Sequence, residues 1–391
     1  MMAMAAAITG VGMSHVGRNT MRPAMAHLAD AALEAIAKAG LTRDDIDGIT
    51  TFPGKSHKSP GVSPLSVGDV RNALGIKTRW HSSSDEGPSQ MSPLMIAAMA
   101  VTTGQARHIL CFRVLTESSS QSPVQRASVP SDMTDRVSDW PSWLLPMNSF
   151  TAANWTAQFA ARYFHEFGMT REHLGKQVVG QRANAQLNPR AIFNGKQMSM
   201  DDYLGARMIS TPLGLYDCDI PIDGACVIIV SALDAAKDLA MPPLRIEAMG
   251  AALSYKETWD QQPDFTRMAA HDAAADMWTH TDLKPEDIDV LALYDGFSIF
   301  VPLWLEAFGF CGHGEAKDFI ADGHTLLGGR HPVNTGGGQL SAGRLHGFGL
   351  LHEACVQLWG EGGARQVNDA RSAICGMGGG PICGAMLIVR E

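Results

Sequence analysis

A duplicated segment constrains the fold more than any other feature of the chain. Residues 27–52 read HLADAALEAIAKAGLTRDDIDGITTF, and residues 271–297 read HDAAADMWTHTDLKPEDIDVLALYDGF. Both copies have the apolar spacing of a helix, then a turn and a short apolar run typical of a buried strand. A second pair, ARHILC at 106–111 and ARSAIC at 370–375, follows in the same order. Since segments that recur in the same order are the signature of a repeated structural unit, we expect two halves with one fold.

The order of elements within each half predicts an α/β protein. Helical periodicity covers 24–39, 93–103 and 270–280, and short apolar runs typical of buried strands cover 46–51, 108–114, 225–231, 288–293 and 372–376. Alternation of this kind is typical of mostly parallel, buried strands. We place the N-terminal half at 1–116 and 212–241, and the C-terminal half at 242–391.

The segment between the repeats, residues 117–211, is too long to be a plain loop. It carries Trp140, Trp143, Trp155 and Tyr163. Because structureless connections of this length are uncommon in compact domains, we predict an inserted subdomain that covers a site. The alternative is surface elaboration without such a role.

Composition narrows the classes of function. The net charge of −9 is spread along the chain without a basic stripe, which argues against nucleic acid as a partner. No apolar run is long enough to span a bilayer, and the first residues read as a strand rather than a signal peptide. The seven cysteines form no CxxC pair, which predicts reduced thiols without disulfides or zinc in a cytoplasmic protein.

Glycine-rich stretches mark the predicted site in the C-terminal third. HPVNTGGGQLSAGRLHGFG, from His331, contains Asn334 and the glycines at 336–338, which permit close approach of a ligand to the backbone. We expect a helix to begin near His346, where its free N–H groups would face an acyl oxygen or a phosphate. A tight turn without a ligand explains the same glycines.

Two further stretches carry reactive side chains. Tyr294 and Asp295 follow a predicted buried strand, at the kind of strand end where α/β proteins bind ligands. A neighbouring cation would lower the pKa of this phenol from about 10 and make it a base.

The second stretch, CGMGGGPICG, begins with Cys375 and contains Cys383 near its end. Each thiol is either a reactive group or a small buried apolar side chain.

Taken together, these stretches resemble the thiolase superfamily, in particular the sterol-carrier-protein-type (nonspecific lipid-transfer protein-like) thiolases. The resemblance runs almost end to end, through AITGVGMS, the first repeat, STPLGLYDCDIPIDGACVIIVSA, LYDGFSIFVPLWLEAFGFC and PVNTGGGQLSAGRLHGFG. It implies a five-layered α-β-α-β-α thiolase fold with an inserted loop subdomain, normally a homodimer.

The four functional elements of that family are altered in this chain. Counting along the family's spacing puts the nucleophilic cysteine at Gly87, with Ser89 as the nearest hydroxyl. Arg344 stands at the position of the family's histidine, and His346 lies two residues later. Tyr294 replaces the family's Asn or His, and Cys375 lies one position away from the C-terminal cysteine.

A branch of the family, the side-chain-cleaving aldolases of steroid catabolism, departs from thiolases in the same way. Its members lack the nucleophile, use tyrosines, and work with a small OB-fold subunit in a heterotetramer. Tyr294 matches one of these tyrosines, and Arg344 stands where the other would fall.

The resemblance therefore implies a carbon–carbon lyase that performs a retro-aldol cleavage of a β-hydroxyacyl-CoA. Tyr294, Arg344, His346 and Cys375 are the expected catalytic residues, and coenzyme A enters as part of the substrate, without a bound cofactor or metal. The expected substrate-binding residues are Ser89, Asp295, Asn334, Gly337, Gly338 and Gly379. Two alternatives remain: acyl transfer through Ser89 or Cys375, and a non-catalytic acyl-CoA-binding subunit.

Overall fold

A computed structural model describes residues 5–56, 59–83, 87–121, 141–149, 151–254 and 256–390. Part of the predicted covering segment, including Trp140, lies outside the described residues. The N-terminal half contains β1 (Ala6–Met13), α1 (Ala24–Ala39), β2 (Gly48–Thr51), α2 (Val67–Leu74), β3 (Trp80–Ser83), α3 (Ser92–Thr102), β4 (His108–Thr116), β7 (Asp223–Ala232) and α10 (Leu233–Ala236).

The inserted segment contains α4 (Glu117–Ser120), α6 (Pro141–Leu144), α7 (Ala152–Phe167), α8 (Arg171–Gln186), α9 (Met200–Leu204), β5 (Met208–Ser210) and β6 (Leu213–Gly214). The C-terminal half contains β8 (Leu244–Leu253), α11 (Ala270–Trp278), β9 (Val290–Leu293), α12 (Phe300–Ala307), α13 (Ala316–Ala321), α14 (Gly338–Ser341), α15 (Phe348–Leu358), β10 (Ser372–Gly379) and β11 (Ile382–Arg390). The predicted helices and strands are therefore present, with ends shifted by a few residues.

The strand order confirms the duplication. The large sheet runs β3-β2-β4-β7-β1-β8-β11-β10-β9, and the halves join where Ala7 pairs with Arg245 and Ile8 with Leu244. In the N-terminal half, β2 pairs with β4 in parallel, and β4 with β7 and β7 with β1 are antiparallel. In the C-terminal half, β9, β10, β11 and β8 repeat these directions in the same order toward the middle of the sheet. β3 pairs in parallel with β2 at the N-terminal edge. At the C-terminal edge, the segment around Val333 takes the equivalent place beside β9, through a parallel bridge to Leu291. Each half is thus one copy of a mixed sheet. Five of the eight pairings in the large sheet are antiparallel and three are parallel, so the expectation of mostly parallel strands is wrong.

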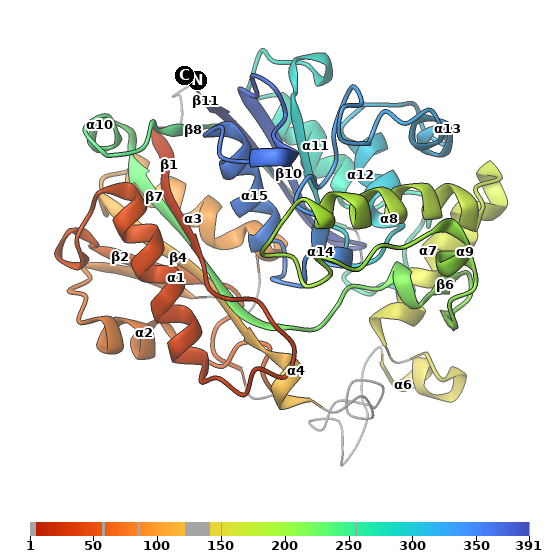
Figure 1. Cartoon of the computed structure of the whole chain (residues 1–391), viewed down its shortest axis with the longest axis horizontal. Coiled ribbons are helices and arrows are strands. Elements are labelled where there is room, and N and C mark those ends of the chain that lie inside the picture. The colour runs from red at the N-terminus through yellow and green to blue at the C-terminus, as the bar shows by residue number, and fades with distance from the viewer. Residues whose placement is uncertain are drawn as a thin grey trace.

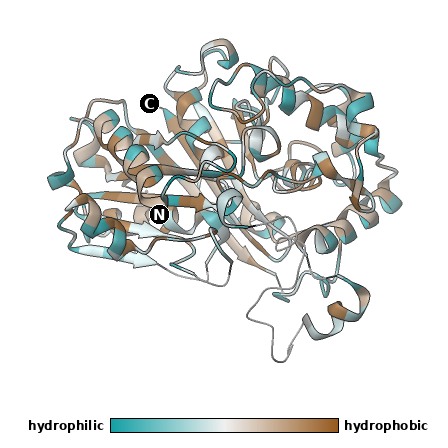
Figure 2. Cartoon of the chain, turned by 60° about the horizontal axis from the view of Figure 1, so that its bottom comes forward, coloured by the Kyte–Doolittle hydropathy of each residue, from teal (hydrophilic) through white to brown (hydrophobic). Residues whose placement is uncertain are grey.

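Helices cover both faces of each half and produce five layers. α1 and α2 pack on the outer face of the N-terminal strands, and α11 and α12 on that of the C-terminal strands. α3 and α15 share one apolar core between the halves. Figure 1 shows the N-terminal half at the left in red and orange, and α7–α9 at the right beside the C-terminal half. The central strands are mostly apolar, and the outer helices carry the polar surface (Figure 2).

The DID sequence of each repeat has a structural role. The carboxylate of Asp47 accepts hydrogen bonds from the backbone N–H groups of Arg107 and His108, at 2.9 and 3.0 Å. Asp289, offset by 242 residues (289 − 47), accepts the equivalent bonds from residues 371 and 372, at 2.8 and 3.0 Å. In both halves this carboxylate fixes the start of the strand that pairs with its own.

Close contact between helix and strand depends on glycine in both halves. A Cβ atom at Gly12 would lie 2.2 Å from the carbonyl oxygen of Ala31 in α1, and one at Gly250 would lie 2.0 Å from that of Ala273 in α11. Neither backbone oxygen has room to move in a packed core. α1 and α11 therefore lie so close to the sheet at Gly12 and Gly250 that these positions leave no space for a Cβ atom.

We predict that Gly250→Ala destabilises the protein by about 1–3 kcal/mol, because α11 must move away from β8. The check is the midpoint of urea unfolding followed by circular dichroism. Gly68→Ala is the matched control. Gly68 lies in α2, and its Cβ would be 3.6 Å from the nearest atom, Ser66 Oγ, which is an ordinary contact distance. The control should be neutral or slightly stabilising. Equal midpoints for the two variants would refute the packing argument.

Candidate active site

The end of β9 fixes the position of Tyr294. Its backbone N–H donates to the carbonyl oxygen of Gly376 in β10, at 2.8 Å. The phenol ring lies 6.3 Å from the ring of Phe300. A Cβ at Gly296 would lie 2.7 Å from the Tyr294 ring, so the YDG sequence leaves room for the ring to fold over its own loop. The phenol is consequently held at the carboxyl end of a buried strand, as the sequence predicted.

Asp295 is completely buried and supports the loop rather than facing open space. Its carboxylate accepts hydrogen bonds from the backbone N–H of Gln339, at 2.9 Å, and from Gln181 Nε2 in α8, at 3.0 Å. Desolvation raises its pKa to about 7. A Cβ at Gly338 would lie 2.0 Å from Asp295 Oδ2, so the glycine admits this carboxylate. The predicted close approach at Gly338 is therefore made by the chain itself.

Asn334 holds the residue that precedes Tyr294. Its Oδ1 accepts from the N–H of Leu293, and its Nδ2 donates to the carbonyl of Leu293, both at 2.9 Å. Its φ of 49° lies in the left-handed region, which Asn tolerates better than most residues. The N–H of Gly337 donates to the carbonyl of Asn334, and Ala185 of α8 packs on this glycine. Asn334 and Gly337 thus fix the end of β9 and its contact with α8 rather than facing open space.

A buried charge cluster lies beside Tyr294, and we refer to Arg113, Glu117, Asp219, Arg344 and His346 as the charge cluster. Arg344 Nη2 donates to Glu117 Oε2 at 2.7 Å, and Arg344 Nη1 lies 3.3 Å from Asp219 Oδ1. Arg113 Nη2 donates to His346 Nδ1 at 2.6 Å. The cluster joins β4, the start of α4, the segment before β7 and the loop before α15.

The two carboxylates keep Arg344 charged. Burial alone would lower the pKa of its guanidinium, but Asp219 and Glu117 raise it above its ordinary value. Desolvation raises the pKa of Asp219 to about 7, although Arg344 opposes that shift. Asp219 therefore titrates near neutral pH, where a general base is most effective.

His346 is a neutral hydrogen-bond donor. Burial lowers the pKa of its imidazole well below the ordinary value, and Arg113 and Arg344 lower it further. Because Arg113 donates to Nδ1, the ring proton lies on Nε2. That nitrogen is 4.0 Å from Glu117 Oε2, beyond hydrogen-bonding distance. No described residue accepts a hydrogen bond from this Nε2–H group, so it can bind a substrate oxygen.

The electrostatic environment of Tyr294 corrects one expectation. Arg344 lowers the pKa of the phenol, as predicted, but desolvation is the larger effect and Asp219 adds to it, so the pKa is raised. The expectation that Arg344 makes Tyr294 acidic is therefore wrong for the free protein. Tyr294 is a neutral phenol at neutral pH, and it can act as a base only if it passes its own proton to another group.

Gly87, before α3, carries no nucleophile, and a side chain there would have to displace the Ser92 hydroxyl. A Cβ there would lie 2.5 Å from Ser92 Oγ. Ser89 has a strained φ of 56°, and its Oγ donates to the carbonyl of Met377 at 2.9 Å. A Cβ at Gly379 would lie 2.7 Å from the ring of Phe300. The hydroxyl of Ser89 and the backbone at Gly379 thus pack against the chain's own atoms, and no described base contacts Ser89 Oγ.

Cys375 lies in the apolar core against which Tyr294 also packs. It is fully buried in β10, opposite Met386 of β11 and Ala292 of β9, and it belongs to the apolar core with Cys355. Desolvation raises the pKa of its thiol well above the ordinary value. Among the described residues, no hydrogen bond connects it to Tyr294 or His346. The structure brings Tyr294, Arg344 and His346 together, and the catalytic role of Cys375 stays a prediction.

Sequence reasoning missed Arg113, Glu117, Asp219 and Gln339. Arg113 carried a usable signal, because it is the one charge inside the apolar run HILCFRVLT of β4. A buried charge requires a partner, and its presence in a strand buried on both faces marks a special site. Gln339 gave no such signal. It interacts with Tyr294 and lowers the pKa of that phenol, and its Oε1 accepts from the N–H of Gly347 at 2.9 Å.

Comparison with known proteins agrees with this site. The Thiolase C-terminal domain-like family matches residues 251–390. The 17-hydroxy-3-oxo-4-pregnene-20-carboxyl-CoA lyase of Mycobacterium tuberculosis is 34% identical over 364 residues, which cover 91% of this chain and 92% of that protein. The steroid side-chain-cleaving aldolase of Thermomonospora curvata is 34% identical over 392 residues, covering 98% and 97%.

This chain belongs to the steroid side-chain-cleaving aldolases of the thiolase superfamily. A solved structure of this family, the Ltp2-ChsH2(DUF35) aldolase, matches with a TM-score of 0.89 at 32% identity and covers 99% of this chain and 98% of the matched chain. Human mitochondrial 3-ketoacyl-CoA thiolase matches with a TM-score of 0.70 at 13% identity, which shows the shared fold alone. None of the helices in the described ranges is long and apolar enough to span a membrane.

We predict that Arg344→Leu destabilises this aldolase-family protein by about 3–5 kcal/mol at pH 8, because Glu117 and Asp219 stay buried without their cation. The loss should shrink at pH 5, where protonation removes the unpaired charge of Asp219. Urea unfolding at both pH values checks this. Arg22→Leu is the control, since the pair of Arg22 with Asp30 is exposed and should contribute little. A pH-independent loss would contradict the assignment.

Proposed function

We propose that the protein is an acyl-CoA carbon–carbon lyase that cleaves a β-hydroxyacyl-CoA by a retro-aldol reaction, with a steroid side chain as the acyl group. The observation that carries the proposal is Tyr294 beside the charge cluster in a thiolase fold without a usable nucleophile. The names of the two relatives support the substrate class. A 17-hydroxy-20-carboxyl-CoA steroid bears its hydroxyl on the carbon β to the thioester carbonyl, which is the arrangement that a retro-aldol cleavage requires.

The first step removes the proton of the β-hydroxyl. Tyr294 takes this proton while it gives its own to Asp219. A phenol with a raised pKa is a strong base once ionised, but it is rarely ionised by itself. Asp219, with a pKa of about 7, accepts the phenolic proton near neutral pH. The electron pair of the O–H bond forms the new carbonyl group, and the Cα–Cβ bond breaks.

The broken bond leaves its electrons on the acyl-CoA as an enolate, and the charge cluster stabilises that charge. Arg344 supplies a positive charge fixed by two carboxylates, and His346 supplies a neutral Nε2–H donor. Preorganised donors of this kind need no reorganisation when the charge develops. The proton held by the Tyr294–Asp219 pair then returns to Cα. The products are a ketone and a shortened acyl-CoA, and every proton is accounted for.

We also propose that the chain acts as a homodimer with a small OB-fold partner subunit. The solved relative with a TM-score of 0.89 is named as a pair, Ltp2-ChsH2(DUF35). Acyl-CoA enters as the substrate, so the chemistry calls for no other cofactor. Catalysis should therefore be assayed with a candidate partner subunit present.

Acyl transfer is the second candidate, and the geometry disfavours it. It needs a nucleophile, and Ser89 Oγ is engaged with the Met377 carbonyl while Cys375 lies in the apolar core. Incubation with acyl-CoA followed by intact-mass measurement separates the hypotheses. An acyl adduct would favour transfer, whereas the lyase predicts no adduct. A non-catalytic subunit predicts binding of acyl-CoA without turnover of a β-hydroxyacyl-CoA.

We predict that Tyr294→Phe lowers kcat by about 10²–10⁴-fold, because the β-hydroxyl loses its proton acceptor. KM should change little, since the ring remains. The measurement is cleavage of a β-hydroxyacyl-CoA with the partner subunit present. Tyr216→Phe is the matched control, because Tyr216 lies outside the charge cluster. The guanidinium of Arg182 lies over its ring, 5.6 Å from the ring centroid. Wild-type rates in Tyr294→Phe would exclude the assigned role.

The pH dependence tests Asp219 separately. Since Asp219 must be ionised to accept the proton, kcat/KM should rise with pH through about 7 and level off above it. Asp219→Asn should lower kcat and abolish this acidic limb. Asp295 also has a pKa of about 7, so it is the alternative source of the limb. Persistence of the limb in Asp219→Asn would assign it to Asp295 and contradict the proton transfer to Asp219.

A further inference from the structure

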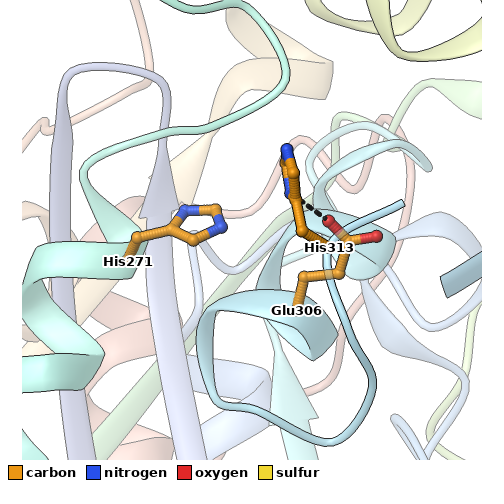
Figure 3. Close-up of side chains that lie close together, drawn as sticks. All are labelled: His271, Glu306 and His313. Atoms are coloured by element: carbon orange, nitrogen blue, oxygen red, sulfur yellow. Dashed lines mark hydrogen bonds and ion pairs between the residues drawn. The ribbon is translucent and has the colours of Figure 1, made fainter. Parts of the chain in front are cut away.

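A second group of polar side chains lies apart from the charge cluster, between α11, α12 and the loop that follows α12. It consists of His271, Glu306 and His313, whose nearest nitrogen and oxygen atoms lie within 4.8 Å of one another. Figure 3 shows the ring of His271 directed toward His313, which contacts Glu306. Among the described residues, no hydrogen bond or ion pair connects this group to the charge cluster. It therefore has no part in the proposed lyase chemistry.

We propose that His271, Glu306 and His313 form a binding site for a first-row transition-metal ion such as Zn²⁺. Two imidazoles and one carboxylate are a donor set that Zn²⁺ takes, whereas Mg²⁺ and Ca²⁺ prefer oxygen ligands alone. His313 Nδ1 lies 3.0 Å from Glu306 Oε2. Two ligands on a tetrahedral zinc ion are about 3.3 Å apart. The ion would take the place of the proton that His313 Nδ1 shares with Glu306.

His271 supplies the third ligand. Its Nδ1 lies 3.1 Å from the carbonyl oxygen and 3.4 Å from the backbone nitrogen of Met268. In the tautomer that donates to the carbonyl, the ring proton is on Nδ1 and the lone pair is on Nε2. Nε2 is buried, and within the described part of the chain it has no hydrogen-bond partner. Closing the site requires this ring to approach by roughly 1–2 Å, which rotation about its side-chain bonds supplies. An ion would satisfy the one buried nitrogen that the protein leaves unpaired there.

The atoms around the three ligands are arranged as a metal site requires. Ligating histidines usually donate their other N–H to a carbonyl or a polar side chain, which fixes the tautomer. His313 Nε2 lies 3.2 Å from Thr266 Oγ1, and that hydroxyl itself donates to Asp264 at 2.7 Å. Glu306 Oε1 accepts from the N–H groups of Gly314 and Ala316 and from the hydroxyl of Tyr163, which leaves Oε2 for the ion.

The site is accessible and joins separate parts of the fold. His313 borders an open cavity of about 560 Å³ that is also lined by Glu166 and Asp264, so an ion and a fourth ligand such as water can enter. The side chain of His313 is 38% exposed, while that of Glu306 is 1% exposed. Tyr163 and Phe167 of α7 contact Glu306 and His313. A bound ion would therefore link α11, α12 and the loop after α12, next to the contacts that α7 makes with Glu306 and His313.

The test is Zn²⁺ binding by the full chain after treatment with a chelator, measured by titration calorimetry. We expect one Zn²⁺ per chain, and we expect His313→Ala to weaken binding at least about tenfold. The control is His165→Ala, an exposed histidine on α7, which should bind as wild type does. Absence of stoichiometric binding, or equal affinity in His313→Ala and wild type, would overturn the proposal.

Co²⁺ gives a second readout, because its visible absorption bands report the ligands directly. Wild type and His165→Ala should show the bands, and both His313→Ala and His271→Gln should lose them. Zn²⁺ should also raise the Tm of wild type and leave that of His313→Ala unchanged. Since neither readout measures turnover, a negative result for the metal leaves the lyase proposal unaffected. Bands that persist in both variants would place the ion elsewhere and contradict the site.

Discussion

The pairing of Arg344 with Glu117 and Asp219 is the interaction on which the rest of the site depends. A buried guanidinium stays charged only when carboxylates offset its desolvation, and here two of them do so. The same pairing brings the loop before α15 to the start of α4 and to the segment before β7. Tyr294 and His346 owe their protonation states to this cluster and to burial. The positive charge is therefore in place before any substrate arrives, where a thiolase would keep a nucleophile and a histidine.

The duplicated scaffold places a phenol at the strand end of only one of its halves, although the charge cluster beside it draws residues from both. Asp47 and Asp289, which are 242 residues apart, each accept backbone hydrogen bonds at the start of the neighbouring strand of their own half. At that offset Tyr294 corresponds to Phe52 (294 − 242), an apolar residue. The segments around Tyr294, including Asn334 and Asp295, are held by hydrogen bonds of their own. The two strand ends are therefore equivalent in backbone but not in side chains, and only that of the C-terminal half carries Tyr294.

Periodicity and the repeat predicted the fold because both are local properties of the sequence. Tyr294, Arg344 and His346 were predicted from their places in motifs, and they meet in the structure. Glu117 and Asp219 were missed because their partner Arg344 is 227 and 125 residues away (344 − 117 and 344 − 219). The direction of the Tyr294 pKa shift was predicted wrongly, since a sequence displays charges but not desolvation. The cysteine spacing predicted no zinc site, and it carries no information about His271, Glu306 and His313, which two helices and a loop bring together.

In the proposed reaction the chain breaks a carbon–carbon bond through an acyl-CoA enolate. Cleavage of a β-hydroxyacyl-CoA in D₂O, with the partner subunit present, tests it most directly. The enolate must collect a proton that has exchanged with solvent through Tyr294 and Asp219. Mass spectrometry of the acyl-CoA product should therefore find one deuterium at Cα and an equal amount of ketone. An acyl-CoA product without deuterium, or release of free coenzyme A in place of a ketone, would contradict the account.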